Sequence, residues 1–371
     1  VIHSAIHQAG HTAAAESVST TVGQPDAVTT RRFQDGLACL YNELMAAGRQ
    51  CYLKTHNLMS VPFMIISELS LIWTLIKTVG TLRNQDILIV GCGYVGQRLA
   101  AALSPRAKVN GLVRTPQTAR QLESQGMDPL ILDLDQPAPK PVNNWRQIYY
   151  FAPPPQQGGK DTRMTHFLRM LGSEVRNLRL VYLGTTGVYG DCDGAWVDEN
   201  QVVNPKAERA LRRWDAEQQL RQWRSETGNQ VIFLRVAGIY GPARLPLTRL
   251  RQRKPMIAAA NAPWTNRIHV DDLVQICIAS MERGMDGEIY NVSDGQPGNM
   301  ADYFNQVADA TGLPRPPLIS PDEASGKLSA GLRSYLAESR RIDNSKVLRE
   351  LGIELKYPTL AQGLAACLDS S

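Results

Sequence analysis

The sequence predicts an α/β fold, in which a doubly wound parallel β-sheet carries helices on both faces and is followed by a small C-terminal α/β lobe. From Asp86 onward, short apolar runs alternate with segments of helical periodicity, which is the pattern of repeated strand, helix, strand units. Hydrophobic residues make up 43% of the 371 residues, enough for a sizeable core and too many for a disordered chain. The first apolar run also leads directly into a glycine-rich turn.

The elements follow in a regular order. Strands are expected at 87–90, 109–113, 130–134, 147–151, 180–183, 231–234 and 288–291. Helices are expected between them at 95–103, 116–124, 165–176, 208–224 and 272–282. Proline-rich stretches fall in the predicted loops at 137–141, 153–155 and 314–317.

The turn after the first strand carries the strongest motif in the sequence. It consists of Gly91, Cys92, Gly93, Tyr94, Val95 and Gly96, which lead into a helix. In such a turn the first glycine allows the tight bend, the second lets backbone approach a pyrophosphate, and the third allows close packing of the helix. The N-terminus of the helix favours a negative charge. The motif predicts a Rossmann-type dinucleotide site, and the alternative is a glycine-rich turn without a ligand.

Arg114 at the end of the second strand indicates which dinucleotide is preferred. An acidic residue at this point binds the ribose hydroxyls of NAD, whereas arginine can pair with the 2′-phosphate of NADP. We therefore expect NADP(H) to be preferred and NAD(H) to be tolerated, the alternative being a solvated charge. Asp133, after the third strand, is expected either to accept a hydrogen bond from the adenine amino group or to cap a turn.

Four later blocks keep the order and spacing of a known family. They are VYLGTTGVYGD at 181–191, LRVAGIYGP at 234–242, RIHVDD at 267–272 and IYNVS at 289–293. Over residues 86–371 the chain resembles the extended branch of the short-chain dehydrogenase/reductase superfamily, the NAD-dependent epimerase/dehydratases, most of which act on nucleotide-sugars. The resemblance implies a cofactor-bound oxidoreductase whose substrate region begins near residue 241.

The resemblance also implies catalytic residues, and here the sequence departs from the family. Thr185 matches the Ser or Thr that binds the substrate oxygen. The family's Tyr-x-x-x-Lys pair is replaced by Arg209 and Arg213, and arginine cannot shuttle a proton because it keeps it at any accessible pH. Arg213 could still clamp a ribose or phosphate. This departure resembles an atypical subgroup of bacterial YeeZ-type proteins, in which the tyrosine motif is lost.

The remaining site assignments follow the same resemblance. Tyr189 and His269 are the other candidates for the missing proton donor, although a structural role is favoured for both. We expect the cofactor also to contact Ala152, Pro153, Thr185 and Arg213. We expect the substrate to contact Thr186, Arg209, Gly238, Arg244, Arg249 and His269.

Charge and cysteine content limit the partners. The basic run at 244–254 predicts an anionic small-molecule substrate such as a diphosphate, or else a solvated helix face. Aromatic residues are not interleaved with it, so nucleic acid is not expected. His3, His7 and His11 share one helical face, but no carboxylate or cysteine completes the set, so no metal is assigned. Six scattered cysteines favour a reducing compartment, the cytoplasm.

The first 83 residues differ from the rest, since they hold four of the six histidines and few charges. We expect 1–83 to be an extension, poorly ordered or joined through a misplaced start. The apolar stretch 58–80 is interrupted by Glu68 and Lys77, so a buried or amphipathic helix is favoured over a membrane span. Residues 84–371 are expected to form the cofactor domain, with its substrate lobe built mainly from 190–205, 241–266 and 295–345.

Two functions remain open. The first is an NAD(P)-dependent epimerase, dehydratase or reductase acting on a nucleotide-sugar or another anionic carbonyl or hydroxyl compound. The second, favoured by the arginine at 209, is a non-catalytic NADP-binding regulator or scaffold. The oligomeric state also stays open, a homodimer being common among the relatives.

Overall fold

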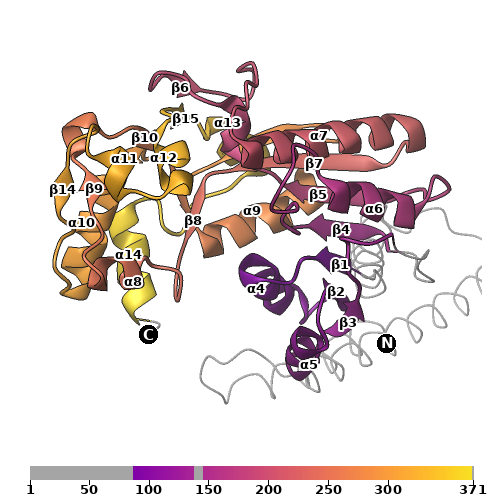
Figure 1. Cartoon of the computed structure of the whole chain (residues 1–371). Helices are drawn as coiled ribbons and strands as arrows, with labels where there is room; N and C mark the ends of the chain where they lie inside the picture. Colours follow the sequence, from indigo (N-terminus) through magenta and orange to yellow (C-terminus); the bar gives the residue numbers. More distant parts are fainter. Residues whose placement is uncertain (1–86, 138–144, 370–371) are drawn as a thin grey trace, which may run out of the picture. The chain divides into compact units, whose positions relative to one another are not determined.

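The computed structural model describes residues 87–137 and 145–369 (Figure 1). Its main sheet has seven parallel strands in the order β12-β7-β5-β4-β1-β2-β3. These are β1 (Ile87–Val90), β2 (Val109–Val113), β3 (Asp128–Ile131), β4 (Gln147–Tyr150), β5 (Arg179–Leu183), β7 (Gln230–Val236) and β12 (Ile289–Val292). The chain winds outward from β1 in both directions, which confirms the predicted doubly wound sheet.

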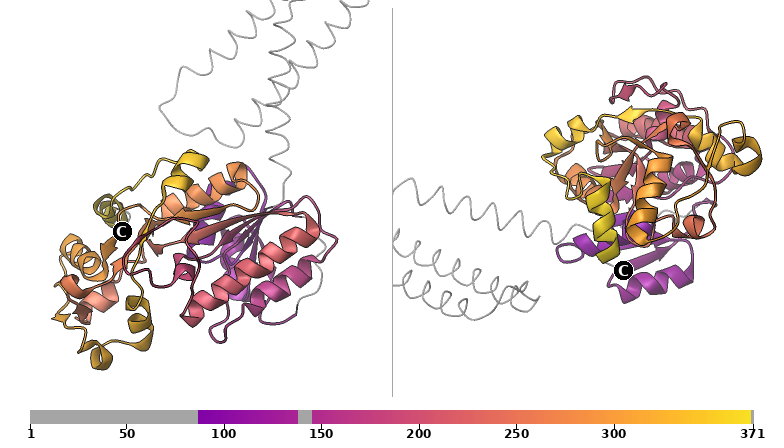
Figure 2. Two further views of the ribbon diagram at one scale, coloured as in Figure 1. Left: turned by 90° about the horizontal axis from the view of Figure 1, so that it is seen from above. Right: turned by 90° about the vertical axis from the view of Figure 1, so that its left-hand side faces the viewer.

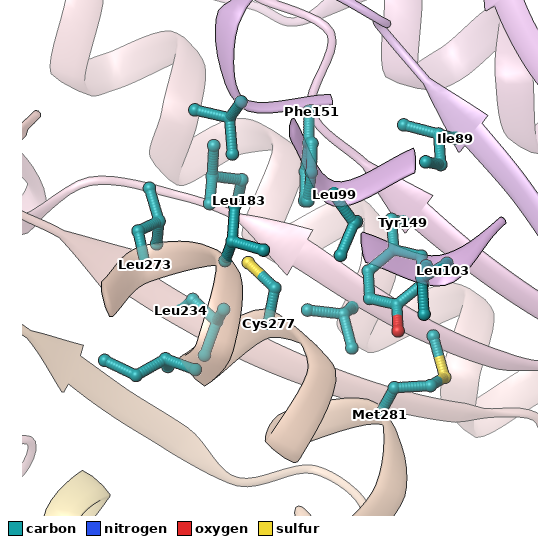
Figure 3. Packing of buried hydrophobic residues seen from close by; sticks show 14 of the residues in the cluster. Ile89, Leu99, Leu103, Tyr149, Phe151, Leu183, Leu234, Leu273, Cys277 and Met281 are labelled. Carbon is teal, nitrogen blue, oxygen red and sulfur yellow. The ribbon is translucent and has the colours of Figure 1, made fainter. Parts of the chain in front are cut away.

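Alternate residues of the strands bury their side chains on opposite faces. In β1, Ile87 and Ile89 join one core, whereas Leu88 and Val90 join the other. The second core is completed by α6 (Thr162–Leu171) and α7 (Glu208–Thr227), and the first by α4 (Tyr94–Leu103), α5 (Pro116–Ser124), α9 (Val270–Arg283) and α13 (Ser345–Leu351). Figure 3 shows Leu273, Cys277 and Met281 of α9 lying on the sheet. Both faces are therefore covered, as parallel sheets require.

Two predicted elements are displaced. The third strand was expected at 130–134, but β3 ends at Ile131 because it pairs with β2 from Asn110 opposite Asp128 to Val113 opposite Ile131. The helix expected at 165–176 runs instead from Thr162 to Leu171. The Asp161 side chain accepts the N–H of Met164 and caps its start, and Gly172, with φ of 78°, ends it.

A smaller lobe follows β7, and Figure 1 and the left view of Figure 2 show most of it gathered beside the sheet, in orange and yellow. A small core around Leu250, Phe304 and Leu364 joins α8 (Leu247–Arg251), α10 (Met300–Thr311) and α14 (Leu360–Asp369). The remaining helical elements are η1 (Thr186–Tyr189), η2 (Ala259–Asn261), α11 (Ala324–Lys327) and α12 (Ala330–Leu336). Short strand pairs are β8 (Gly238–Tyr240) with β11 (Arg267–His269), β9 (Met256–Ile257) with β14 (Leu318–Ile319), β10 (Trp264–Thr265) with β13 (Gly298–Asn299), and β6 (Trp196–Val197) with β15 (Arg341–Ile342).

The expectations for residues 1–83, including the apolar stretch 58–80, lie outside the described residues. Within the two described ranges, no helix combines the length and the apolar composition that crossing a membrane requires.

Candidate active site

A cleft of about 550 Å³ opens at the carboxyl ends of β1 and β4, where the winding direction of the sheet reverses. Ligands of open α/β sheets bind at this point. Of the residues expected to contact the cofactor, all but Thr185 line this first cleft. They are Gly91, Cys92, Gly93, Tyr94, Val95, Gly96, Arg114, Asp133, Ala152, Pro153 and Arg213.

The glycine turn forms the floor of the first cleft. Gly91 has a φ of 92°, and a Cβ there would lie 2.6 Å from the Ala152 nitrogen. A Cβ at Gly96 would lie 2.8 Å from the Gly91 carbonyl oxygen, whereas nothing lies within 4 Å of the position at Gly93. The first and third glycines are thus required by packing, and the second leaves room for a ligand. No side chain caps the start of α4, so its first N–H groups are available to a phosphate.

The thiol in this turn is buried. Cys92 is 3% exposed, and its Sγ lies 3.6 Å from the carbonyl oxygen of Ile89. Burial raises the pKa of the Cys92 thiol to about 12, so it stays protonated and unreactive at neutral pH. The residue therefore lines the cleft as a packed neutral group.

Arg114 and Asp133 lie at one end of the first cleft. The Arg114 side chain is 62% exposed, and its Nη1 lies 3.7 Å from Asp135 Oδ2. Asp135 is bound more closely by Arg163, through contacts of 2.6 Å from Nε to Oδ1 and 2.8 Å from Nη2 to Oδ2. The hydrogen bond from Arg163 lowers the pKa of Asp135. Asp133 Oδ1 accepts the N–H of Asp135 at 3.0 Å, so it caps a turn, as one of the two interpretations predicted.

Tyr94 and Arg244 lie at another part of the same cleft. The Tyr94 hydroxyl donates to the Pro242 carbonyl oxygen at 2.9 Å, and burial raises the pKa of this tyrosine. The Arg244 guanidinium lies 5.0 Å from the centre of the Tyr94 ring. Arg244 thus lines the first cleft with the glycine turn.

A second, smaller cleft of about 130 Å³ adjoins the first. Three parts of the chain each contribute one residue to the first cleft and one to the second. These are Leu183 at the end of β5 and Thr185 just after it, Ile239 and Gly238 in β8, and Arg213 and Arg209 in α7. The second cleft is completed by Thr186, Gly187, Val236, Ala237, Trp264, Thr265, Asn266, Tyr335, Glu338 and Arg340. Thr185, which was expected to contact both ligands, thus lies at the boundary between the clefts.

The side chains at this boundary are held firmly. Thr185 Oγ1 accepts the N–H of Gly187 at 3.1 Å, which leaves its hydroxyl hydrogen able to donate to a ligand. Arg213 Nη1 donates to the carbonyl oxygens of Leu183 at 3.1 Å and Ala152 at 3.4 Å. One turn earlier, Arg209 Nη1 donates to Ser334 Oγ at 2.7 Å, so the two arginines point to different partners.

The helix that carries both arginines is anchored to the sheet by a buried ion pair. Arg235 of β7 lies 2.9 Å from Glu217 of α7, and their side chains are 2% and 0% exposed. Because breaking such a pair leaves an uncompensated buried charge, it fixes α7 in place.

Three predicted site residues line neither of the two clefts. Tyr189 is 1% exposed and its hydroxyl donates to Asn291 Oδ1 at 2.7 Å, so it is a core residue. Arg249 donates to the Pro255 carbonyl oxygen at 2.8 Å inside the small lobe. His269 is fully buried, its Nδ1 accepts the N–H of Asp271 at the start of α9, and burial lowers its pKa.

Several lining residues were not anticipated from the sequence. The second cleft takes Tyr335, Glu338 and Arg340 from a segment more than 120 residues after Arg209. Glu338 is 7% exposed, and its Oε2 accepts from Arg340 Nη1 at 2.9 Å. No sequence motif surrounds Tyr335, Glu338 and Arg340, because the fold of the small lobe brings them to the cleft. The described residues contain no cluster of three or more metal-binding side chains.

Comparison with known proteins groups the chain with one family. Residues 160–293 match the NAD dependent epimerase/dehydratase family. The chain is 26% identical over 292 residues to Protein YeeZ of Escherichia coli K12. The matched region covers 74% of this chain and 97% of that protein.

Solved structures agree with this grouping. A functionally unknown conserved protein from Silicibacter pomeroyi is 32% identical, with a TM-score of 0.69 over 78% of this chain and 99% of the other. UDP-glucuronic acid 4-epimerase from Bacillus cereus, solved in complex with NAD, is 17% identical with a TM-score of 0.61 over 77% and 98%, so it shares the fold. The chain belongs to the NAD-dependent epimerase/dehydratase family, and within it is similar to the YeeZ-type proteins.

Proposed function

We propose that the chain is an NAD(P)-dependent oxidoreductase of the epimerase, dehydratase or reductase type. The dinucleotide would occupy the first cleft and an anionic carbonyl or hydroxyl compound, such as a nucleotide-sugar, the second. The observation that carries the proposal is that the two clefts adjoin at Leu183 and Thr185, so that two bound ligands would meet there. A hydride transfer needs this contact between donor and acceptor carbons.

The residues of the first cleft fit a dinucleotide. Gly93 leaves space for the pyrophosphate, and the uncapped start of α4 supplies N–H donors to it. Arg213, at the far end of the cleft, can donate to a ribose or phosphate oxygen from a fixed position. When bound, a nicotinamide dinucleotide supplies or accepts the hydride, and the protein supplies position and electrostatics.

We further propose a preference for NADP(H). Arg114 is exposed at the rim of the first cleft, and the nearest carboxylate, that of Asp135, already has both oxygens bound by Arg163. The guanidinium of Arg114 can therefore turn to a 2′-phosphate at little cost. Thr118, which also lines the cleft, can add a hydroxyl donor.

The second cleft favours an anionic substrate. It is lined by two arginines, Arg209 and Arg340, and one carboxylate, that of Glu338. The Arg340 side chain is 10% exposed and its Nη1 already donates to Glu338 Oε2 at 2.9 Å, whereas the Arg209 side chain is 41% exposed. Arg209 is therefore the more accessible of the two cations to an anionic ligand. The Thr185 hydroxyl can donate to the reacting oxygen of the same ligand.

The proposal is tested by incubating the purified chain with NADPH or NADP⁺ and a panel of UDP-glucose, UDP-glucuronic acid, dTDP-glucose and small ketones. Binding is followed by cofactor fluorescence, redox change by absorbance at 340 nm, and isomeric products by chromatography with mass detection. Conversion of at least one compound is expected. Tight NADPH binding with no conversion would instead support a non-catalytic regulator, which the arginine at position 209 favours.

A further inference from the structure

Tyr335 is a phenol in the second cleft that no sequence motif singles out. It lies on α12 of the small lobe, in the wall completed by Glu338 and Arg340. Its hydroxyl oxygen lies 4.0 Å from the position that a Cβ at Gly238 would occupy. Because Gly238 has no side chain, the space in front of the phenol stays open to a ligand.

Tyr335 differs from the other described residues that line the second cleft. The arginines of this cleft keep their protons, and its Thr, Asn and Trp side chains do not exchange protons near neutral pH. Glu338 is the other group able to exchange a proton, but its Oε2 accepts from Arg340 and its Oε1 lies 3.7 Å from Arg209. Both carboxylate oxygens therefore serve to hold arginines, and the phenol is the available donor.

Arg209 holds the helix that carries this phenol. Its Nη1 donates to Ser334 Oγ at 2.7 Å, and its Nη2 donates to the Ser334 carbonyl oxygen at 3.4 Å. Its Cζ lies 5.9 Å from the centre of the Tyr335 ring. A guanidinium on α7 thus contacts residues 334 and 335 of α12 together.

A second cation, Arg267 of β11, interacts electrostatically with Tyr335. Arg267 is 8% exposed, and its Cζ lies 4.0 Å from the centre of the Tyr303 ring.

From these contacts we propose that Tyr335 is the acid and base of the reaction, and that Arg209 is the positioning residue that holds it. The inference rests on the proposed function. Position 209 on α7, where the family places the catalytic tyrosine, would then have a positioning role. The phenol would be supplied instead by α12 of the small lobe.

The proposed step balances as follows. In the reducing direction, Tyr335 would donate its proton to the carbonyl oxygen while a bound reduced nicotinamide supplied the hydride to the carbonyl carbon and the C=O π electrons moved to oxygen. The products would be an alcohol, the oxidised cofactor and a phenolate that water reprotonates. In the oxidising direction the Tyr335 phenolate would take the hydroxyl proton, and the oxidised cofactor would accept the hydride.

The test compares Tyr335→Phe with Tyr357→Phe, a change at another half-buried tyrosine that lines neither cleft. Tyr335→Phe is expected to lower kcat at least 100-fold for a compound that the wild-type chain converts, since a general acid contributes about 10²- to 10⁴-fold. KM and the Kd for NADPH should stay within about threefold, because the ring and both clefts are kept. Tyr357→Phe should leave all three values unchanged.

Arg209 is tested through its dependence on Tyr335. Arg209→Ala is expected to lower kcat about tenfold in the wild-type background but to have little further effect in Tyr335→Phe, because it acts through the phenol. Arg209→Lys should recover part of the loss. As a measurement without turnover, 3-fluorotyrosine at position 335 should change its ¹⁹F resonance when UDP-glucuronic acid is added, and one at position 357 should not.

The outcomes separate the two proposals. A wild-type chain that converts a compound, with Tyr335→Phe within threefold of it in kcat, overturns the role of Tyr335 and leaves the proposed function standing. Additive effects of the Arg209 and Tyr335 changes overturn the positioning role. A wild-type chain that binds NADPH but converts none of the panel overturns the proposed function, and the catalytic role of Tyr335 falls with it.

Discussion

Arg209 and Arg213 lie one helical turn apart on α7 and border different clefts. Arg213 donates to the carbonyl oxygens of Leu183 and Ala152, at the ends of two central strands. Arg209 donates instead to Ser334 on a helix of the small lobe. Two identical residue types at this spacing therefore have separate roles, and substitutions should separate them.

Arg213→Ala is expected to weaken NADPH binding about tenfold, since a charge-assisted hydrogen bond contributes about 1.5–3 kcal/mol, part of which water replaces. Arg209→Ala should leave the Kd for NADPH within about twofold, because that side chain lines the other cleft. Fluorescence titration of the cofactor measures both. Equal weakening by the two changes would contradict the separation of the clefts.

Arg114→Ala should weaken NADPH binding about 10- to 100-fold and NADH binding no more than about twofold, because only NADPH carries the 2′-phosphate. Arg120→Ala, an exposed arginine on α5 that lines neither cleft, is the matched control and should change neither Kd. Titrations at two salt concentrations measure the difference. A similar loss for both cofactors would rule out the NADP preference.

Gly91→Ala should destabilise the fold and abolish cofactor binding, since its φ of 92° is strained for alanine and the new Cβ would lie 2.6 Å from the Ala152 nitrogen. Gly126→Ala is a useful comparison, because Gly126 has a φ of 77° but nothing within 4 Å of its Cβ position. That change should cost about 1–2 kcal/mol, the conformational term alone. Urea unfolding of both variants gives the additional cost of the collision at Gly91, which we expect to exceed about 2 kcal/mol.

The buried carboxyl group of Asp294 should make the free energy of unfolding depend on pH. Asp294 is 6% exposed, and burial raises the pKa of its carboxyl group to about 7, although the Gln296 N–H and the nearby Arg267 oppose the shift. A raised pKa means that the folded state keeps the proton after the unfolded state has lost it. The carboxyl group therefore stabilises the fold fully below about pH 4, and this contribution is lost as the pH rises to about 7.

Asp294→Asn tests this dependence, because the amide does not titrate. The free energy of unfolding of the wild-type chain should fall relative to that of the variant by roughly 2–4 kcal/mol between pH 4 and pH 7. Urea denaturation at steps of half a pH unit measures the difference. A constant difference over this interval would show that folding does not raise the pKa of this carboxyl group.

The parts of the fold that depend on local signals could be predicted from the sequence. The helix at 116–124 has the predicted bounds because Thr115 caps it and Pro116 occupies its first turn. The glycine turn was located for the same reason, since Gly91 and Gly96 each meet a close backbone contact and Gly93 leaves open space. The third strand was misplaced because its partner β2, and not its own apolar run, sets where pairing ends.

The second cleft was harder to predict because its walls come from distant segments. Arg209 and Ser334 are 125 residues apart, and no local pattern links them. His269 and Tyr189 carry chemically suitable groups, but their environment is the core, which sequence spacing does not reveal. Residue type thus identified candidates, and tertiary packing decided which of them a ligand can reach.

The buried ion pair of Arg235 and Glu217 anchors α7, which forms one wall of the second cleft. The helix α12 has no fully buried residue of its own, and its Leu332 and Leu336 pack against a small core that includes Ile257 and Ile319. Because Arg209 of α7 contacts Ser334 and Tyr335 of α12, the ion pair that anchors α7 also influences where α12 lies.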